Sequence, residues 1–494
     1  MSAMEKKSTL DKFLKGISTQ TLIAASSAVL QIVVFAIFSR LLSKEDFGYY
    51  AAITGLTMIF MGISDAGIGS AVIQKKELTE KYSSTAFTMS LIVGVLVGSV
   101  FFLLSPVLAN VIIDEKLEAP LKWMTIPLVL NSVNGYGSSM LRRDLRFGIA
   151  GGCKIATYVV SAVASIIYAL HGGGVYALVM LYVGDAVLYT GVIFTLVRIP
   201  RLGLGRAEAV GVLSFGGWLT LGVIVSQIAA QIDKLVLGKW LSVERLGAYN
   251  RPSGFVNNLI GQINGTFDTV LFPILSGFQD SKEQFRRILY SSFGLLTTMG
   301  VLLAIVLFFN ARLIILIFFG NDWLDLVPIM QISSLSAIFM LDNTLADCFF
   351  RSFNLVKIGF FIRSGGIALS LLFISIGVRY DIVGVAFAIL TANLLLVIFK
   401  LSFLSVKSEA RFRTMGWIGI KSFVPGLPII LLGSIFFLLP QSIVFDITKA
   451  AVMGVGLLIL LLKFPKFVGE EYNTMLYPKI EMLLSKSRIG QKLL

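Results

Sequence analysis

Ionisable side chains occur inside stretches of this chain that are otherwise apolar, and their types suit ion coupling or the binding of an anionic ligand. The basic residues are Lys154, Lys234, Arg251, Arg363 and Lys400, and the acidic residues are Asp65, Asp185, Asp233, Asp268, Asp342 and Asp347. A charged group within a membrane-spanning helix is costly, so it usually marks a transport pathway, a ligand site or an internal ion pair. This set is therefore the main source of candidate functional residues.

The roles open to these residues differ with their positions. Lys234 and Arg251 lie near the outer ends of their apolar stretches and Lys400 near an inner end, where long cations can snorkel to the interface. Lys154 and Arg363 lie deeper, where they either bind an anionic head group or form internal ion pairs. Three acidic residues are candidates for coupling to a proton or sodium gradient, or else are fixed partners of neighbouring cations: Asp65, Asp268 and Asp347.

Uncharged polar side chains recur at helical spacing in the same kind of stretch. Residues separated by three, four or seven positions lie on one face of a helix. Three such faces comprise Gln20, Ser27 and Gln31; Thr220, Gln227, Gln231 and Lys234; and Asn250, Asn257, Asn264 and Asp268, with Arg251 on the flank. Lone polar groups are explained by hydrogen bonds between helices. Whole faces that repeat favour a water-filled cavity, lined by the ranges 17–38, 48–72, 211–237 and 248–274.

The composition indicates which elements must hold these side chains. The chain has 494 residues, of which 56% are hydrophobic and 14% charged, and its mean hydropathy is +0.86. A soluble protein would have about 25% charged residues. Apolar stretches of about 20 residues, long enough to cross a bilayer as helices, recur between residues 17 and 463. We predict an all-α polytopic membrane protein with about 14 transmembrane helices.

The positive charge of the chain follows the predicted topology. The formal net charge is +14, and most lysines and arginines fall in alternate connections and in the terminal segments. Because cytoplasmic loops are enriched in these residues, both termini are predicted to be cytoplasmic. The excess of positive charge is then a property of the topology, and no nucleic-acid partner is implied.

The segment SRLLSKEDFGYY at 39–50 is echoed by GKWLSVERLGAY at 238–249. Each contains a serine suited to cap the next helix, an acidic residue for its first turn and a glycine that permits close helix packing. Six predicted spans separate the two segments, so the repeat is parallel, as in many alternating-access transporters. The predicted divisions are a cytoplasmic amphipathic segment 1–16, a six-helix N-lobe 17–208, a six-helix C-lobe 209–405, two further helices in 406–463 and a basic cytoplasmic tail 464–494.

Residues suited to catalysis or metal binding are few. The chain has one histidine and two cysteines, Cys153 and Cys348, without metal-ligand spacing, and it lacks a GxxxxGK[ST] phosphate loop. We therefore expect no catalytic site, no metal and no cofactor. These absences favour a transporter over an enzyme.

Several segments of the chain resemble a known family. They are SRLLSKEDFGYYAAITGL followed by DAGIGSAVIQKKE, MLRRDLRFGIAGG, HGGGVYALV, IDKLVLGKWLSVERLGAYNRP and LFPILSGFQ. They are similar to the Wzx-type oligosaccharide flippases of the multidrug/oligosaccharidyl-lipid/polysaccharide exporter superfamily, most clearly between residues 39 and 280. The resemblance implies a two-lobed, fourteen-helix protein of the bacterial inner membrane. It also implies a polyprenyl-pyrophosphate-linked oligosaccharide substrate, which moves from the cytoplasmic to the periplasmic leaflet. The shared motifs are largely structural and assign no ligand residue.

Residues and resemblance together predict a flippase that works by alternating access in surface polysaccharide biosynthesis, for example of lipopolysaccharide O-antigen. Asparagines and glutamines would bind sugar hydroxyls, and Arg251, Lys154 and Arg363 would bind the pyrophosphate. The expected partners are the lipid-linked oligosaccharide and membrane lipid, with other polysaccharide-assembly membrane proteins as candidates. A drug antiporter of the same superfamily, an integral glycan-modifying enzyme and a non-transporting scaffold stay open as alternatives.

Overall fold

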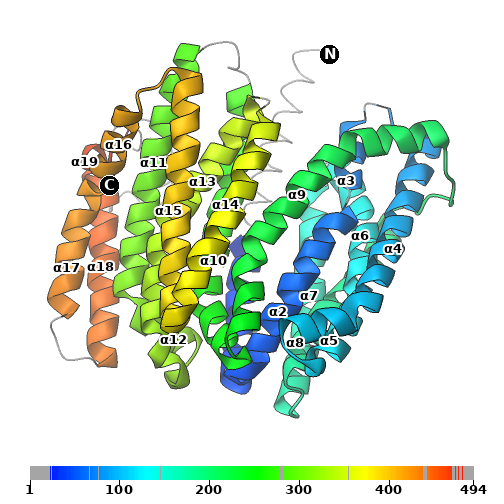
Figure 1. Ribbon diagram of the computed structural model, residues 1–494, viewed down its shortest axis with the longest axis horizontal. Coiled ribbons are helices and arrows are strands. Elements are labelled where there is room, and N and C mark those ends of the chain that lie inside the picture. Colours follow the sequence, from blue (N-terminus) through cyan, green and yellow to red (C-terminus); the bar gives the residue numbers. More distant parts are fainter. Residues whose placement is uncertain are drawn as a thin grey trace. The chain divides into compact units, whose positions relative to one another are not determined.

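A computed structural model describes residues 25–469 except 66, 76, 145, 277–281, 354 and 438–441, together with the single residues 23, 473, 477 and 481. The regular elements are α-helices and short 3₁₀-helices, and no strand occurs in this part of the chain (Figure 1). The helices form two compact units, which divide between Asn250 and Arg251. The predicted segments 1–16 and 464–494 lie wholly or largely outside the described residues.

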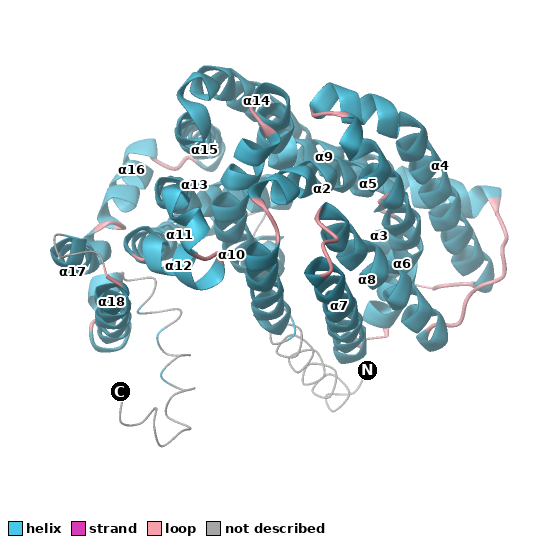
Figure 2. Ribbon diagram, turned by 90° about the horizontal axis from the view of Figure 1, so that it is seen from below, coloured by secondary structure: helices cyan, strands magenta, loops and turns pink. Residues whose placement is uncertain are grey.

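The first unit contains the helices up to the beginning of α10. They are a helix over Ala25–Leu41, α2 (Lys44–Asp65), α3 (Ile68–Gln74), α4 (Glu80–Ile112), α5 (Glu118–Trp123), α6 (Thr125–Arg143), α7 (Phe147–Leu170), α8 (Val175–Leu196), α9 (Arg206–Trp240) and the first turns of α10 (Val243–Ser276). Helix α2 packs against α9 and α6, and α6 also contacts α3, α4 and α8. Figure 2 shows α3, α6, α7 and α8 side by side. Helix α6 is therefore surrounded by other helices of its own unit.

The second unit contains the rest of α10 and the helices that follow. They are α11 (Lys282–Phe309), α12 (Ala311–Phe318), α13 (Val327–Ser352), α14 (Val356–Gly377), α15 (Asp381–Ser408), α16 (Phe412–Lys421), α17 (Leu427–Phe437), α18 (Ile443–Lys463) and α19 (Pro465–Val468). Helix α13 packs against α11 and α15, and α14 packs against α15. An aromatic cluster of buried Phe285 and Phe349 and partly buried Phe353 joins α11 to the C-terminal end of α13, with ring centroids of Phe285 and Phe353 4.0 Å apart.

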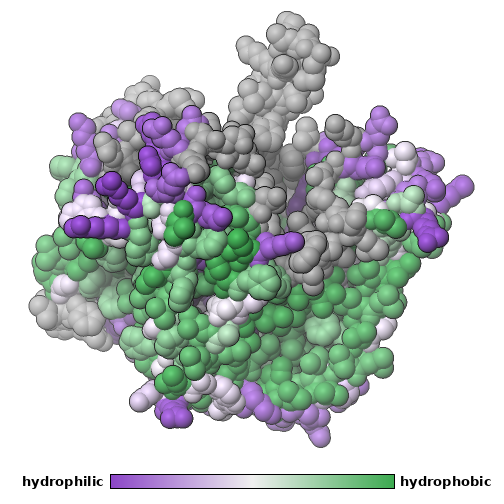
Figure 3. Space-filling view, turned by 45° about the horizontal axis from the view of Figure 1, so that its top comes forward, coloured by the Kyte–Doolittle hydropathy of each residue, from purple (hydrophilic) through white to green (hydrophobic). Residues whose placement is uncertain are grey.

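The surface has the character of a protein whose sides contact lipid. In Figure 3 hydrophobic side chains form broad continuous patches on the coloured surface. Helix α4 contributes exposed Val100, Leu103 and Val107. Within the described residues, nine helical ranges are long and apolar enough to cross a membrane, and one of them, Lys357–Ser408, contains both α14 and α15. The count of fourteen spans and the cytoplasmic termini stay predictions.

The two echoed sequence segments form capped helix starts. In the first, the backbone N–H of Asp46 donates to Ser43 Oγ at 3.1 Å, and the N–H of Ser43 donates to Asp46 Oδ2 at 3.0 Å. In the second, the N–H of Arg245 donates to Ser242 Oγ at 3.2 Å. The expected serine caps are thus confirmed, and they fix where α2 and α10 begin.

The glycines of these segments bring the two helix starts into contact. A Cβ atom on Gly48 would lie 1.9 Å from the carbonyl oxygen of Val243, and one on Gly247 would lie 1.9 Å from that of Lys44. Any side chain at either position would collide with backbone of the other helix, so glycine is required for this approach. The contact is reciprocal, and both sides of it belong to the first unit. The first unit extends to Asn250, whereas the N-lobe predicted from the repeat ends at 208. The unit is defined by contacts between residues and the lobe by repetition in the sequence, so the lobe boundaries stay a prediction.

Candidate functional site

An ion pair joins α7 and α8 in the first unit. Lys154 Nζ donates to Asp185 Oδ2 at 2.6 Å, and Thr157 Oγ1 donates to Asp185 Oδ1 at 2.8 Å. Lys154 Nζ also lies 4.8 Å from the ring centroid of Tyr189. The Asp185 side chain is 13% exposed and that of Lys154 is 47% exposed. Lys154 is therefore paired yet still accessible to a second anion.

This pair forms because α7 and α8 are joined by a tight turn. The turn HGGG spans residues 171–174, and Gly172 and Gly174 have φ values of 84° and 51°. Residues with side chains rarely adopt such values. The turn folds α8 back along α7, which places Asp185 beside Lys154 although 31 positions separate them.

The polar face of α9 packs onto α2. A Cβ atom on Gly62 would lie 3.2 Å from Gln227 Cγ, and one on Gly55 would lie 3.8 Å from Gln231 Oε1. Gln231 is buried, and its Oε1 accepts a hydrogen bond from Lys234 Nζ at 2.7 Å. This geometry matches the alternative of polar packing between helices. The assignment of Gln227, Gln231 and Lys234 to a ligand cavity stays a prediction.

Three charged residues meet in the second unit. Asp347 on α13 forms salt bridges with two cations. Its Oδ2 lies 2.9 Å from Nη2 of Arg363 on α14, and its Oδ1 lies 2.9 Å from Nζ of Lys400 on α15. Lys400 is 2% exposed, so its predicted snorkelling to the interface is wrong. Its Nζ also donates to the backbone oxygen of Asn343 at 3.3 Å. Asp347 and Arg363 thus form an internal ion pair, the alternative to ion coupling and head-group binding that the sequence left open for each of them.

Other candidate residues have separate surroundings. Arg251 is 9% exposed, and its guanidinium carbon lies 4.7 Å from the ring centroid of Phe319. Asn257 is exposed, whereas Gln31, Asn250 and Asn264 are partly buried. Gln20 lies outside the described residues, as do the side chains of Asp65, Thr220 and Asp268. The structure therefore assembles two ion-pair clusters from the predicted set and leaves the remaining assignments as predictions.

A polar pocket in the first unit was not anticipated from the sequence. Its volume is about 390 Å³, and it is lined by Met61, Ser64, Gly69, Ile73, Asn131, Ser132, Asn134, Gly135, Ser138, Ser139, Arg142 and Tyr189. Most of these residues belong to α6, where Asn131, Asn134, Ser138 and Arg142 follow one another at helical spacing. The helical spacing of these polar residues is visible in the sequence, but the pocket also needs Met61, Ser64, Gly69, Ile73 and Tyr189 from three other helices.

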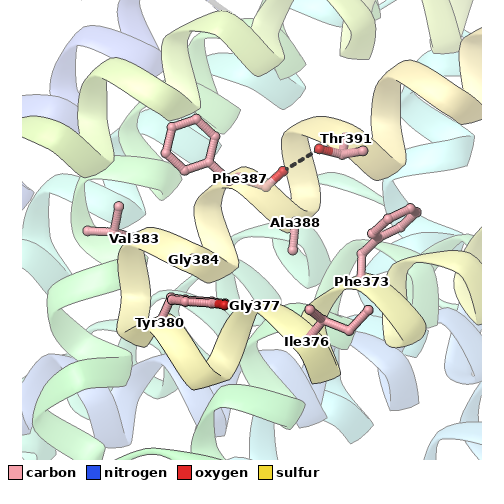
Figure 4. A pocket seen from close by; sticks show the side chains of 9 residues that line it. All are labelled: Phe373, Ile376, Gly377, Tyr380, Val383, Gly384, Phe387, Ala388 and Thr391. Atoms are coloured by element: carbon pink, nitrogen blue, oxygen red, sulfur yellow. Dashed lines mark hydrogen bonds between the residues drawn. The ribbon is translucent and has the colours of Figure 1, made fainter.

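A second pocket lies between α14 and α15 in the other unit. It has a volume of about 460 Å³, and Figure 4 shows that Phe373, Ile376, Val383 and Phe387 are among its lining residues. The hydroxyl of Thr391 donates to the backbone oxygen of Phe387 at 2.9 Å. This pocket is lined mainly by apolar side chains and carries no charge, so it is unsuited to an anionic head group.

Comparison with known proteins places the chain in a family. A family model described as "Polysaccharide biosynthesis protein" matches residues 37–328. The teichuronic acid biosynthesis protein TuaB of Bacillus subtilis (strain 168) is 24% identical over 314 residues, which are 63% of this chain and 65% of that protein. The lipopolysaccharide biosynthesis protein WzxC of Escherichia coli (strain K12) is 22% identical over 311 residues, which are 61% of this chain and 62% of that protein. The chain thus spans just under two thirds of the length of these curated relatives.

The fold is shared with a solved structure. The lipid II flippase MurJ, in an inward closed conformation, superimposes with a TM-score of 0.68 at 16% identity, covering 90% of this chain and 98% of that protein. Together with the apolar helices, this likeness defines the chain as a multi-pass, all-α membrane protein, as predicted. Because the family model covers more than half of the sequence, the chain belongs to the polysaccharide biosynthesis protein family. The resemblance to Wzx-type proteins is confirmed.

Proposed function

We propose that this protein moves an oligosaccharide carried on polyprenyl pyrophosphate from the cytoplasmic to the periplasmic leaflet of the bacterial inner membrane. The match of residues 37–328 to the polysaccharide biosynthesis family carries the proposal. Relatives named for teichuronic acid and lipopolysaccharide biosynthesis support a surface glycan as the cargo. The fold shared with a lipid II flippase supports a lipid-linked substrate. The activity is movement by alternating access without covalent change, so the protein is not an enzyme.

The exposed fraction of each cationic side chain indicates which cation the pyrophosphate would contact first. A ligand residue must reach the incoming anion, and the side chain of Lys154 is 47% exposed, compared with 25% for Arg363 and 2% for Lys400. Asp185 holds Lys154 in place and fixes its ammonium group, as preorganised sites require. We therefore place Lys154 first among the head-group ligands. Arg251 and Arg363 follow it, because both are more deeply buried.

The three acidic candidates for ion coupling have different proposed roles. Asp347 contacts two cations, Arg363 and Lys400, each at 2.9 Å, which makes it a fixed structural partner in our proposal. Asp65 and Asp268 remain the proposed coupling residues, with a proton or sodium gradient as the driving force. We propose that this transport uses no bound cofactor.

The proposal is tested by deleting the gene and restoring it with chosen variants. Deletion should cause a lipid-linked glycan to accumulate on the cytoplasmic face and reduce the surface glycan. Lys154→Ala should restore transport about tenfold less well than the natural protein, because a charge-assisted bond to phosphate is lost. Lys122→Ala is the matched control, since Lys122 forms a comparable 2.6 Å pair with Glu118 in the same unit.

Two results would overturn parts of the proposal. Unchanged amounts of every lipid-linked glycan after deletion, combined with lost efflux of cationic dyes, would assign the protein to drug export. Equal restoration by Lys154→Ala and Lys122→Ala, at equal expression, would remove Lys154 from the head-group site but leave the transport activity standing.

A further inference from the structure

The polar pocket of the first unit has the size and shape of a ligand site. It is bounded by α2, α3, α6 and α8, and its volume of about 390 Å³ lies in the range of roughly 300–1,000 Å³ usual for small-molecule sites. Helix α6 contributes Asn131, Asn134, Ser138 and Arg142, whose spacing puts them on one face. This pocket differs from the Lys154 ion pair, although Tyr189 borders both.

The pocket wall contains polar groups whose hydrogen bonds are unfilled. Asn134 is 4% exposed, and neither its Oδ1 nor its Nδ2 has a hydrogen-bond partner among the described residues. Ser64 is 3% exposed, and its Oγ is also without a partner in that part of the chain. Leaving buried amide and hydroxyl groups unpaired is costly, and natural structures seldom do so. Polar atoms on a ligand within the pocket would satisfy both residues.

The lining chemistry matches a sugar. An asparagine amide offers two N–H donors and a carbonyl acceptor, and serine hydroxyls both donate and accept. Ring hydroxyls of a sugar have the same dual character, so several can be bound at once. Ser138 and the hydroxyl of Tyr189 are already joined at 3.0 Å, which orients both at the pocket edge.

One end of the pocket carries a positive charge. Arg142 lines the pocket in the last turn of α6, is exposed, and forms no ion pair within the described part of the chain. Its planar guanidinium can bind a phosphate or carboxylate through two parallel hydrogen bonds. In the predicted topology this end of α6 is cytoplasmic. An anionic group on a ligand that enters from the cytoplasm would therefore meet Arg142 first.

We propose that this pocket binds a sugar residue that bears a negatively charged group. Asn134 and the serines of α6 bind the ring hydroxyls, and Arg142 binds the charged group. The choice of a sugar rests on the proposed function, whereas the binding itself does not require transport. The pocket thus provides a contact for the glycan within one compact unit, in addition to the pyrophosphate contact proposed for Lys154.

Binding is measured on the full-length protein in lipid nanodiscs, because sugar-based detergents would compete. Saturation-transfer NMR is recorded with a panel of hexose 1-phosphates (glucose, galactose, mannose and N-acetylglucosamine), with the corresponding methyl glycosides and with inorganic phosphate. At least one hexose 1-phosphate should bind about tenfold more tightly than its methyl glycoside, as expected for a charge-assisted bond. Inorganic phosphate should bind much more weakly than that hexose 1-phosphate.

Three variants assign the binding to the pocket. Asn134→Leu should weaken sugar binding about tenfold, the value expected for losing two hydrogen bonds, with an unchanged or higher melting temperature because a buried unpaired amide is removed. Asn110→Leu is the matched control, since Asn110 is an exposed asparagine of α4 outside the pocket. Arg142→Ala should remove the preference for the phosphorylated sugar and leave methyl glycoside binding unchanged, which tests the proposal even if Asn134→Leu does not fold.

The outcomes separate this proposal from the proposed function. If no sugar of the panel binds, if inorganic phosphate binds as tightly as the hexose phosphates, or if Asn134→Leu behaves like Asn110→Leu, the pocket is not a sugar site. Transport of a lipid-linked glycan can still be intact in each of these cases. Sugar binding without any transport activity would instead support the pocket and overturn the function.

Discussion

Replacing Asp347 by asparagine should destabilise the second unit strongly. The carboxylate of Asp347 is bound by Arg363 and Lys400, each at 2.9 Å, and the side chain of Lys400 is only 2% exposed. Removing the carboxylate leaves this ammonium group in an apolar interior without its counter-charge. Breaking a buried pair in this way costs about 3–5 kcal/mol of unfolding free energy.

A second substitution tests whether the unpaired charge causes this loss. In Asp347→Asn combined with Lys400→Met, the buried ammonium is replaced by an apolar side chain of similar length, and replacing a buried pair by apolar groups is often neutral. Arg363 is 25% exposed and can turn toward water when Asp347 is neutral. We therefore expect the double variant to recover most of the stability lost in Asp347→Asn.

The measurement is the unfolding free energy of each variant in mixed micelles, followed by tryptophan fluorescence and combined in a double-mutant cycle. A cost of less than about 1 kcal/mol for Asp347→Asn, the usual value of an exposed pair, would contradict this expectation, and so would a lack of recovery on adding Lys400→Met. Either result would mean that Asp347 is not a fixed partner of these cations, and its predicted role in ion coupling would then regain support.

Three further variants test the helix packing and the Lys154–Asp185 ion pair. Gly247→Ala should lower the unfolding free energy by about 1–3 kcal/mol, because its Cβ would lie 1.9 Å from the backbone oxygen of Lys44. Gly261→Ala in the same helix, where a Cβ meets nothing within 4 Å, should raise the unfolding free energy by about 0.5–1 kcal/mol. Equal unfolding free energies for the two variants would contradict both expectations. Asp185→Asn should cost no more than about 1 kcal/mol in the same unfolding assay, because Lys154 is half exposed and water can solvate its charge. It should nevertheless slow glycan transport in the complementation assay, since the ammonium group is no longer held in place; transport at the natural rate would argue against a positioning role for Asp185.

The sequence predicted the elements of the fold well, because their signals are local. Apolar stretches of membrane-spanning length became helices, and the serines of the echoed segments cap α2 and α10 as expected. The echo also indicated close packing at Gly48 and Gly247, although it did not show that the two glycines face each other's helix.

The partners of the charged residues could not be predicted, because they depend on contacts distant in the sequence. Lys400 and Asp347 lie on different helices, separated by α14, and nothing in the local pattern of either helix identifies the other. The polar face of Gln227 and Gln231 was recognisable, but whether it lines a cavity or packs on glycines of α2 depends on the neighbouring helix. The polar stripe on α6 was present in the sequence, but the pocket that it lines depends on residues of α2, α3 and α8 that are distant along the chain.

Reconstitution of the purified protein into liposomes measures the proposed transport of lipid-linked oligosaccharide itself. Liposomes would contain a labelled polyprenyl-pyrophosphate oligosaccharide in both leaflets, and a membrane-impermeant glycosidase outside would cleave only the exposed glycans. We predict that liposomes with the protein lose all of the label, including the fraction initially protected in the inner leaflet. If that fraction stays protected as it does in protein-free liposomes, with the protein folded and a proton or sodium gradient applied, the protein does not flip lipid-linked oligosaccharide.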